Sequence, residues 1–180
     1  MRRNANVAML AAGLCVWGGI VAAQSAAGKK AGASDSAAHA FMRKAAQANL
    51  AEVELGKLGA DRGQDAGVKQ YGQHMVDDHG KAAKELEELA QQEGATLPTY
   101  VAPAHKAAKE RLEKLSGEAF DRAFAAQMVK DHQAAVALFR TQARTGKDPE
   151  VKAWAAKMLP NLEEHLKQAQ ALSREARASR

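Results

Sequence analysis

Apolar and polar residues repeat along most of the chain with the three-and-four spacing of an amphipathic helix. After residue 36, strong helix formers (Ala, Leu, Glu, Lys and Gln) predominate, and β-branched residues rarely alternate with polar ones. Four long segments carry such apolar stripes, and none has the period of two that a half-buried strand requires. The pattern predicts an all-α protein.

Capping and turn residues delimit the four long helices. Gly94 is placed to stop the second helix, and Asp148 followed by Pro149 is a typical helix start, because proline at the first helical position loses no hydrogen bond. The expected ranges are about 36–60, 65–93, 117–145 and 149–172. The turns between the first two and between the last two helices are tight.

The connection between the second and third helices is much longer. Residues 95–116 contain Pro98 and Pro103 and are expected to form one short helix, about 104–115. Such a segment is long enough to travel back along a bundle, so the second and third long helices would run parallel. The prediction is a ferritin-like four-helix bundle with a long crossover between helices 2 and 3. A simple up-and-down bundle is the alternative.

The N-terminal residues have the order of a secretory signal. Arg2 and Arg3 precede an apolar run at 7–22, and small residues around Ala23 suit signal peptidase. We interpret 1–23 as a signal peptide, 24–35 as a flexible tether, 36–172 as the bundle and 173–180 as a basic tail. The apolar run is short for the roughly 20 residues of a membrane span, and Leu14 before Cys15 is unlike a lipoprotein site.

Export predicts a periplasmic protein without a transmembrane span in its mature part, with association with the outer membrane as a further option. The only cysteine, Cys15, lies in the signal segment, so the mature protein would have no thiol. The formal charge of +5 arises from residues near the two ends, because residues 36–172 contain equal numbers of basic and acidic side chains. Without a concentrated basic face, nucleic acid is not an expected partner.

Each long helix carries at least one polar side chain on its apolar stripe. These residues are Glu52 in the first helix, His79 in the second, Asp121 and His132 in the third, and His165 in the fourth. With a rise of 1.5 Å per residue and parallel second and third helices, His79 and His132 share a level, and the tight turns bring Glu52 and His165 close to it. We therefore predict one polar layer of Glu52, His79, His132 and His165, with Met75, Met128 and Met158 a turn away.

Such a layer contains suitable ligands for a transition metal, Cu, Fe or Zn. The first functional hypothesis is therefore that the polar centre binds a metal ion or a small ligand and serves metal handling or stress defence in the cell envelope. Imidazole binds all three, carboxylates suit harder ions and thioethers select Cu(I). The candidate metal-site residues are Glu52, His79, His132, His165, Met75, Met128 and Asp121. Asp78 and Asp131 are candidate acceptors that would fix the histidine tautomers.

The metal hypothesis does not extend to an enzyme. Di-iron bundles use Glu-x-x-His, but Val76, Val129 and Leu162 stand three residues before the histidines. No nucleophile with a base and no phosphate-binding loop is present, so catalysis is not expected.

A structural interpretation of the same residues is the alternative. Methionines commonly fill cores, and a buried histidine commonly bonds a facing carboxylate, here Glu52 or Asp121. The protein would then be a non-enzymatic structural or interaction protein of the cell envelope, with self-association as an option.

Several segments resemble one known family. They are 48–56 (ANLAEVELG), 75–79 (MVDDH), 116–121 (SGEAFD), 132–136 (HQAAV) and Leu159-Pro160 followed by His165. Over about residues 41–172 the chain resembles the exported bacterial proteins grouped as domain of unknown function 4142, often labelled outer-membrane proteins. The resemblance implies a ferritin-like fold and an envelope location, and it implies no established activity.

Overall fold

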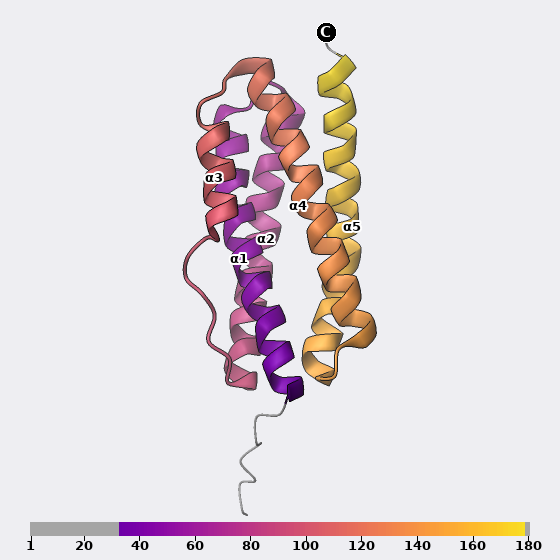
Figure 1. The fold of residues 1–180 in the computed structure, drawn as a ribbon. Helices are drawn as coiled ribbons and strands as arrows, with labels where there is room; N and C mark the ends of the chain where they lie inside the picture. The colour runs from indigo at the N-terminus through magenta and orange to yellow at the C-terminus, as the bar shows by residue number, and fades with distance from the viewer. Residues whose placement is uncertain (1–32, 179–180) are drawn as a thin grey trace, which may run out of the picture. The chain divides into compact units, whose positions relative to one another are not determined.

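The computed structural model describes residues 33–178, and side chains from residue 37 onward. This range contains no strand and five helices: α1 (Ala33–Arg62), α2 (Ala66–Glu93), α3 (Pro103–Leu112), α4 (Gly117–Thr145) and α5 (Pro149–Ala178). The four long helices form two antiparallel hairpins, α1 with α2 and α4 with α5 (Figure 1). The all-α prediction is confirmed.

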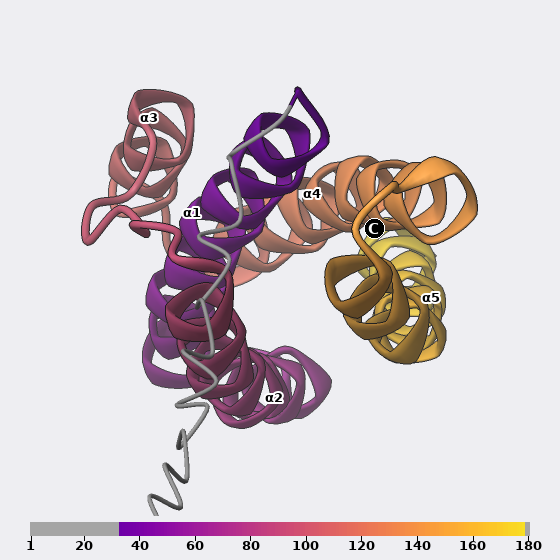
Figure 2. The ribbon, with the colours of Figure 1, turned by 90° about the horizontal axis from the view of Figure 1, so that it is seen from below.

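The crossover between the hairpins carries the chain from one end of the bundle to the other (Figure 1). Within it, α3 packs on the outside of the bundle against α1 and α4 (Figure 2). As a result α2 and α4 run parallel. Besides its hairpin partner, α1 packs against α4 and α2 packs against α5, which places α2 and α4 diagonally opposite. This is the predicted ferritin-like arrangement, and the up-and-down alternative is wrong.

Capping interactions define the helix ends, and those at Gly94 and Asp148 were expected from the sequence. Asp65 Oδ1 accepts hydrogen bonds from the backbone N–H groups of Gly67 (2.7 Å) and Val68 (3.3 Å) at the start of α2. Gly94 ends α2 with a left-handed φ of 66°, where a side chain would strain the backbone. Asp148 Oδ1 accepts from the N–H of Val151 at 2.9 Å at the start of α5.

Two helix ends differ from the expected boundaries. Helix α1 already begins at Ala33, within the expected tether, and α5 continues to Ala178 through most of the expected basic tail. Residues 173–178 contain neither glycine nor proline, so nothing in the sequence stops the helix there. The expected signal peptide and the tether up to residue 32 lie outside the described residues. No helix in the described range is long and apolar enough to cross a membrane.

Two hydrophobic clusters fill the bundle. The first lies toward the α4–α5 turn and contains Phe41, Phe139 and Trp154, with ring centroids 5.0 Å apart for Phe41–Phe139 and 6.1 Å for Phe41–Trp154. The second lies toward the α1–α2 turn around Phe120 and Phe124. Glu52, His79, His132 and His165 each stand, along their own helix, between members of the two clusters. The polar layer therefore has an apolar cluster on either side along the bundle axis.

Glycines bring the backbones of α1 and α2 into direct contact beside the second cluster. A Cβ added at Gly72 would lie 2.5 Å from the backbone nitrogen of Ala60 and 2.6 Å from the carbonyl oxygen of Gly56. Distances this short are forbidden between a Cβ and backbone atoms, so only glycine permits the approach. The contact fixes the spacing of this hairpin two turns of helix away from His79.

Candidate metal centre

Three buried histidines from three helices converge in the polar layer. His79 comes from α2, His132 from α4 and His165 from α5, and as whole residues they are 4%, 1% and 2% exposed. Their ring centroids are 5.6 Å apart for His79–His132 and 5.4 Å apart for the other two pairs. We call these residues the histidine trio. The estimate of heights from sequence thus agrees with where the structure places them.

The three rings also direct ligand atoms toward one another. One ligand nitrogen of each ring lies within 4.8 Å of those of the other two. Three nitrogens that bind one ion at 2.0–2.1 Å in tetrahedral geometry lie about 3.4 Å apart. The separation in the structure is therefore at most about 1.4 Å longer than in such a site.

Each ring of the trio uses one nitrogen to hydrogen-bond an oxygen acceptor. The pairs are His79 Nδ1 with Asn49 Oδ1 (2.9 Å), His132 Nδ1 with the carbonyl oxygen of Met128 (3.0 Å), and His165 Nε2 with Asp78 Oδ2 (3.1 Å). Because the partners accept, a neutral ring donates its N–H there and carries its lone pair on the other nitrogen. Such outer hydrogen bonds fix tautomer and orientation in metal-binding histidines.

The remaining nitrogens of the trio are buried without any hydrogen-bond partner: His79 Nε2, His132 Nε2 and His165 Nδ1. A buried polar atom left unpaired costs about 1–3 kcal/mol, and three within one layer are unusual in a native protein. Three lone pairs cannot bond each other, whereas one metal ion satisfies all of them. The donor set therefore fits a transition metal on the evidence of its own unsatisfied atoms.

Burial keeps the trio in the neutral form that binds metals. Removal from water lowers the pKa of His132 to about 4, and the neighbouring His165 contributes in the same direction. Burial, reinforced by His132 and His165, also lowers the pKa of His79 well below its usual value. The pKa of His165 is lowered by burial as well, against the opposing hydrogen bond to Asp78. No proton competes with a metal at these nitrogens near neutral pH.

Glu52 lies beside the trio rather than within it. Its Oε1 is 4.0 Å from His132 Nδ1, and its Oε2 is buried without a hydrogen-bond partner. Burial, with the nearby negative Asp131, raises the pKa of Glu52 well above the usual value. A cation bound by the trio would favour the ionised carboxylate, so Glu52 is suited to balance charge.

Other candidates from the sequence lie elsewhere. Asp121 is not brought to the histidines: its two oxygens accept from the backbone N–H groups of Gln64 (3.0 Å) and Asp65 (2.8 Å), tying α4 to the α1–α2 turn. Met75 and Met128 are fully buried in the second hydrophobic cluster, which matches the core-filling interpretation.

Of the two carboxylates expected to orient histidines, only Asp78 does so. It bonds His165 across to α5, not its sequence neighbour His79. The expectation for Asp131 is wrong: this residue accepts from Gln127 (2.9 and 2.8 Å) and lies 4.0 Å from His105.

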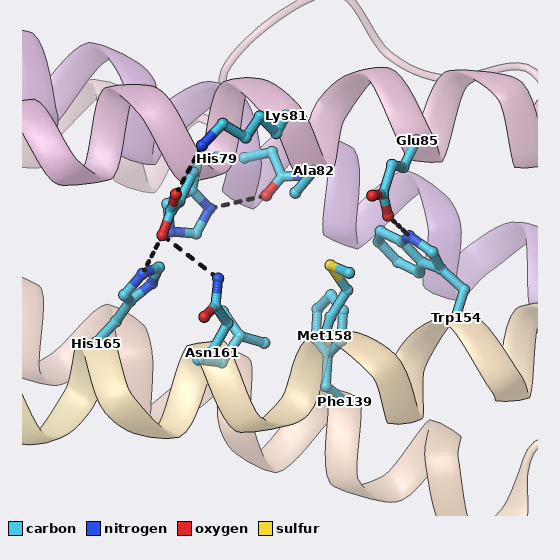
Figure 3. A pocket seen from close by; sticks show the side chains of 12 residues that line it. His79, Lys81, Ala82, Glu85, Phe139, Trp154, Met158, Asn161 and His165 are labelled. Carbon is cyan, nitrogen blue, oxygen red and sulfur yellow. Dashed lines mark hydrogen bonds and ion pairs between the residues drawn. The ribbon is translucent and has the colours of Figure 1, made fainter.

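A cavity of about 150 Å³ reaches the trio from the face between α2 and α5. His79, His165, Asp78, Asn161 and Met158 line it, with Trp154 at its other side (Figure 3). A second cavity of about 170 Å³ lies toward α1, α3 and α4, and is lined by Glu52, His105, Asp131 and His132 among others. Each side of the histidine layer therefore adjoins a cavity.

Two contributors were not identified from the sequence. Asn49 stands one helical turn before Glu52 on the same stripe, a spacing that was available as a signal. His74 stands one turn before Asp78 and bonds its Oδ2 at 2.9 Å, but it lies off the apolar stripe of α2.

Solved structures with this fold include metal-bound proteins. "Crystal structure of DUF305 fragment from Deinococcus radiodurans" matches with a TM-score of 0.68 at 18% identity, covering 79% of this chain and 97% of that chain. CopM in its Cu(I)-bound form matches with a TM-score of 0.65 at 16% identity, and the match covers 77% of this chain and 96% of the CopM chain. CopM in its Ag-bound form matches with a TM-score of 0.64 at 17% identity, and the match covers 77% of this chain and 95% of the CopM chain. At these identities the similarity establishes the fold.

Comparison of the sequence with curated proteins finds no match. The family profile described as "Domain of unknown function (DUF4142)" matches residues 22–172, which is most of the chain and includes every residue of the trio. The sequence segments that resemble this family all lie within that match. The protein therefore belongs to the DUF4142 family.

Proposed function

We propose that this protein binds one transition-metal ion of the copper class between His79, His132 and His165, and serves metal handling in the cell envelope. Two observations carry the proposal: one ligand nitrogen of each ring lies within 4.8 Å of those of the other two, and each ring keeps one buried nitrogen without a hydrogen-bond partner. Each ring is already oriented through its other nitrogen. Binding then needs little ordering of side chains.

Several features favour copper over a harder ion. The trio offers only imidazole nitrogens, which suit Cu, Zn and Fe(II) better than Mg or Ca. CopM, which shares the fold, has been solved with Cu(I), Cu(II) and Ag. The envelope location rests on the signal-like order of residues 1–23 and the absence of cysteine from the rest of the chain. Handling here means storage or delivery of the ion.

Anaerobic calorimetric titration of the purified full chain with Cu(I), Zn(II) and Fe(II) tests the proposal. We expect uptake of one equivalent, tightest for Cu(I). Replacing His79 or His132 with Leu should weaken metal binding at least 100-fold, because only two of the three ligands remain. Circular dichroism should stay helical, because leucine is tolerated in the bundle core. His39→Leu is the matched control: His39 is a histidine outside the trio that bonds the carbonyl oxygen of Glu93 (3.0 Å).

The structural interpretation makes the opposite forecast. If the layer only holds helices together, no ion is taken up stoichiometrically, or uptake is unchanged when His79 and His132 are both removed. Either result would refute the metal proposal. Replacing His79 together with its partner Asn49 by Leu would then leave the protein as stable or more stable, because both members of a buried polar pair are removed.

A further inference from the structure

A second group of metal-binding side chains lies next to the trio and reaches the surface. Asp78 Oδ2 contacts His74 Nε2 at 2.9 Å and His165 Nε2 at 3.1 Å. One ligand atom from each of these residues lies within 4.8 Å of the other two. We call His74, Asp78 and His165 the outer group. It has the imidazole and carboxylate donors that bind first-row transition ions.

Exposure rises steadily outward through this group. The side chain of His165 is 3% exposed, that of Asp78 is 18% exposed and that of His74 is 41% exposed. The trio itself is at most 4% exposed, so an ion needs a path to reach it. The cavity lined by Asp78, His165 and His79 lies on this side (Figure 3). His74 lines a neighbouring surface hollow instead, together with Tyr71 and Gln168. Asp78, which contacts both His74 and His165, therefore connects the exposed ring to the side chains that line the cavity.

His165 belongs to both groups through its two different nitrogens. Its Nε2 contacts Asp78, and its Nδ1 is buried without a partner. The rings of His74 and His165 are 5.1 Å apart, and those of His165 and His79 are 5.4 Å apart. One imidazole thus connects a half-exposed set of ligands to a buried one.

We propose that the outer group captures a transition-metal ion at the surface and passes it through His165 to the trio. This inference rests on the proposed function. An ion at the outer group takes the place of the N–H hydrogens on Nε2 of His74 and His165, and each neutral ring then carries its proton on Nδ1. For the ion to move inward, the proton of His165 returns to Nε2 and frees Nδ1. No proton is lost overall and no redox step is involved.

This exchange of tautomers has a stoichiometric consequence. A neutral imidazole has only one lone pair for a metal, so His165 serves one ion at a time. The two sites exclude each other near neutral pH. We therefore expect one bound ion per chain rather than two, and a loading rate that depends on the outer group although the final affinity does not.

Stopped-flow absorption during mixing of the full chain with Cu(II) measures loading directly. We expect His74→Ala to lower the second-order loading rate at least tenfold, with one equivalent still bound and the affinity within about twofold of wild type. His105→Ala is the matched control, because His105 is a partly exposed histidine lining the cavity on the opposite side. It should load at the wild-type rate.

The outcomes separate the inference from the proposed function. If His74→Ala loads as fast as wild type, or if His105→Ala is the slow variant, the outer group is not the route, while a one-ion trio site stands. If His74→Ala abolishes uptake while His132→Leu binds normally, the outer group is the binding site itself and the trio proposal fails. If wild type binds two equivalents tightly at neutral pH, the transfer of one ion through His165 is wrong. If it takes up no metal at all, both the transfer and the proposed function are wrong.

Discussion

Asp121 and the histidine trio are buried to a similar degree in the same bundle, yet their hydrogen bonding differs completely. Asp121 is 5% exposed, and both of its carboxylate oxygens accept backbone N–H groups of the α1–α2 turn. Each trio histidine is bonded through one nitrogen only, and its other nitrogen has no partner. Asp121 and His132 are about three helical turns apart along α4, so general features of the fold do not explain the contrast.

The difference distinguishes a polar group that serves the fold from one suited to a ligand. Satisfied buried groups contribute to folding, whereas unsatisfied ones destabilise it by about 1–3 kcal/mol each. A bundle tolerates the second kind only where other interactions compensate, and here apolar clusters lie on both sides of the layer. Unpaired atoms that converge are thus a stronger indication of binding than burial or residue type alone.

The largest expected effect on stability comes from removing the carboxylate of Asp121, both of whose oxygens are hydrogen-bonded. Asp121→Ala should lower the free energy of unfolding by about 4 kcal/mol, because it leaves two backbone N–H groups without their acceptor. Urea denaturation measures the change. Asp121→Asn keeps one acceptor oxygen and should lose about half as much. Metal uptake by the folded protein should not change; a loss of uptake would mean that Asp121 belongs to the metal site after all.

The histidine trio, in which each ring has only one hydrogen-bonded nitrogen, is expected to make stability depend on pH. Between its unfolded value near 6.5 and its folded value of about 4, His132 binds a proton in the unfolded chain but not in the folded one. The metal-free protein should therefore lose about 3 kcal/mol of stability from His132 as the pH falls through this window. Urea denaturation of wild type and of His132→Leu at pH 7 and pH 4 measures how much of the change in the free energy of unfolding is due to His132. Equal pH dependence in both proteins would contradict it.

A smaller effect is expected in the glycine contact between α1 and α2. Gly72→Ala should destabilise the protein by about 2 kcal/mol, because its Cβ would overlap backbone atoms of α1. Gly80→Ala is the matched control on the same helix, since a Cβ there meets nothing within 4 Å. It should stabilise the helix by about 0.5–1 kcal/mol. If thermal unfolding shows the same sign for both variants, the close contact does not determine the hairpin spacing.

The sequence predicts much of this structure because its signals are local. Asp65, Gly94 and Asp148 mark helix ends by their own chemistry, and the fixed rise per residue is enough to place His79, His132 and His165 at one height. The same reasoning shows why Asp121 was misplaced: it shares the stripe of His132 but stands 11 residues earlier, about 16 Å along the axis. The apolar stripe predicts the direction in which a side chain points. The position of the residue along the helix axis decides which side chains of the other helices it meets.

Other features depend on side-chain conformations that spacing does not determine. Asp78 was expected to orient a histidine, but whether it reaches His79 or crosses to His165 depends on its rotamer and on the distance between α2 and α5. His74 lies outside the apolar stripe, so periodicity gives no reason to select it. The unpaired state of the three nitrogens is visible only when every neighbouring donor has been placed.

The trio takes His79 from the first hairpin and His132 and His165 from the second, so a bound ion would join the two halves of the chain across their interface. Ligand binding adds its free energy to folding, about 2.7 kcal/mol at a free-ion concentration one hundred times the dissociation constant. The metal-free chain would open more often and would be cut sooner by proteases, whereas the loaded chain would persist. The lifetime of the protein would then follow the supply of the metal, and its abundance would record how much metal is available to it.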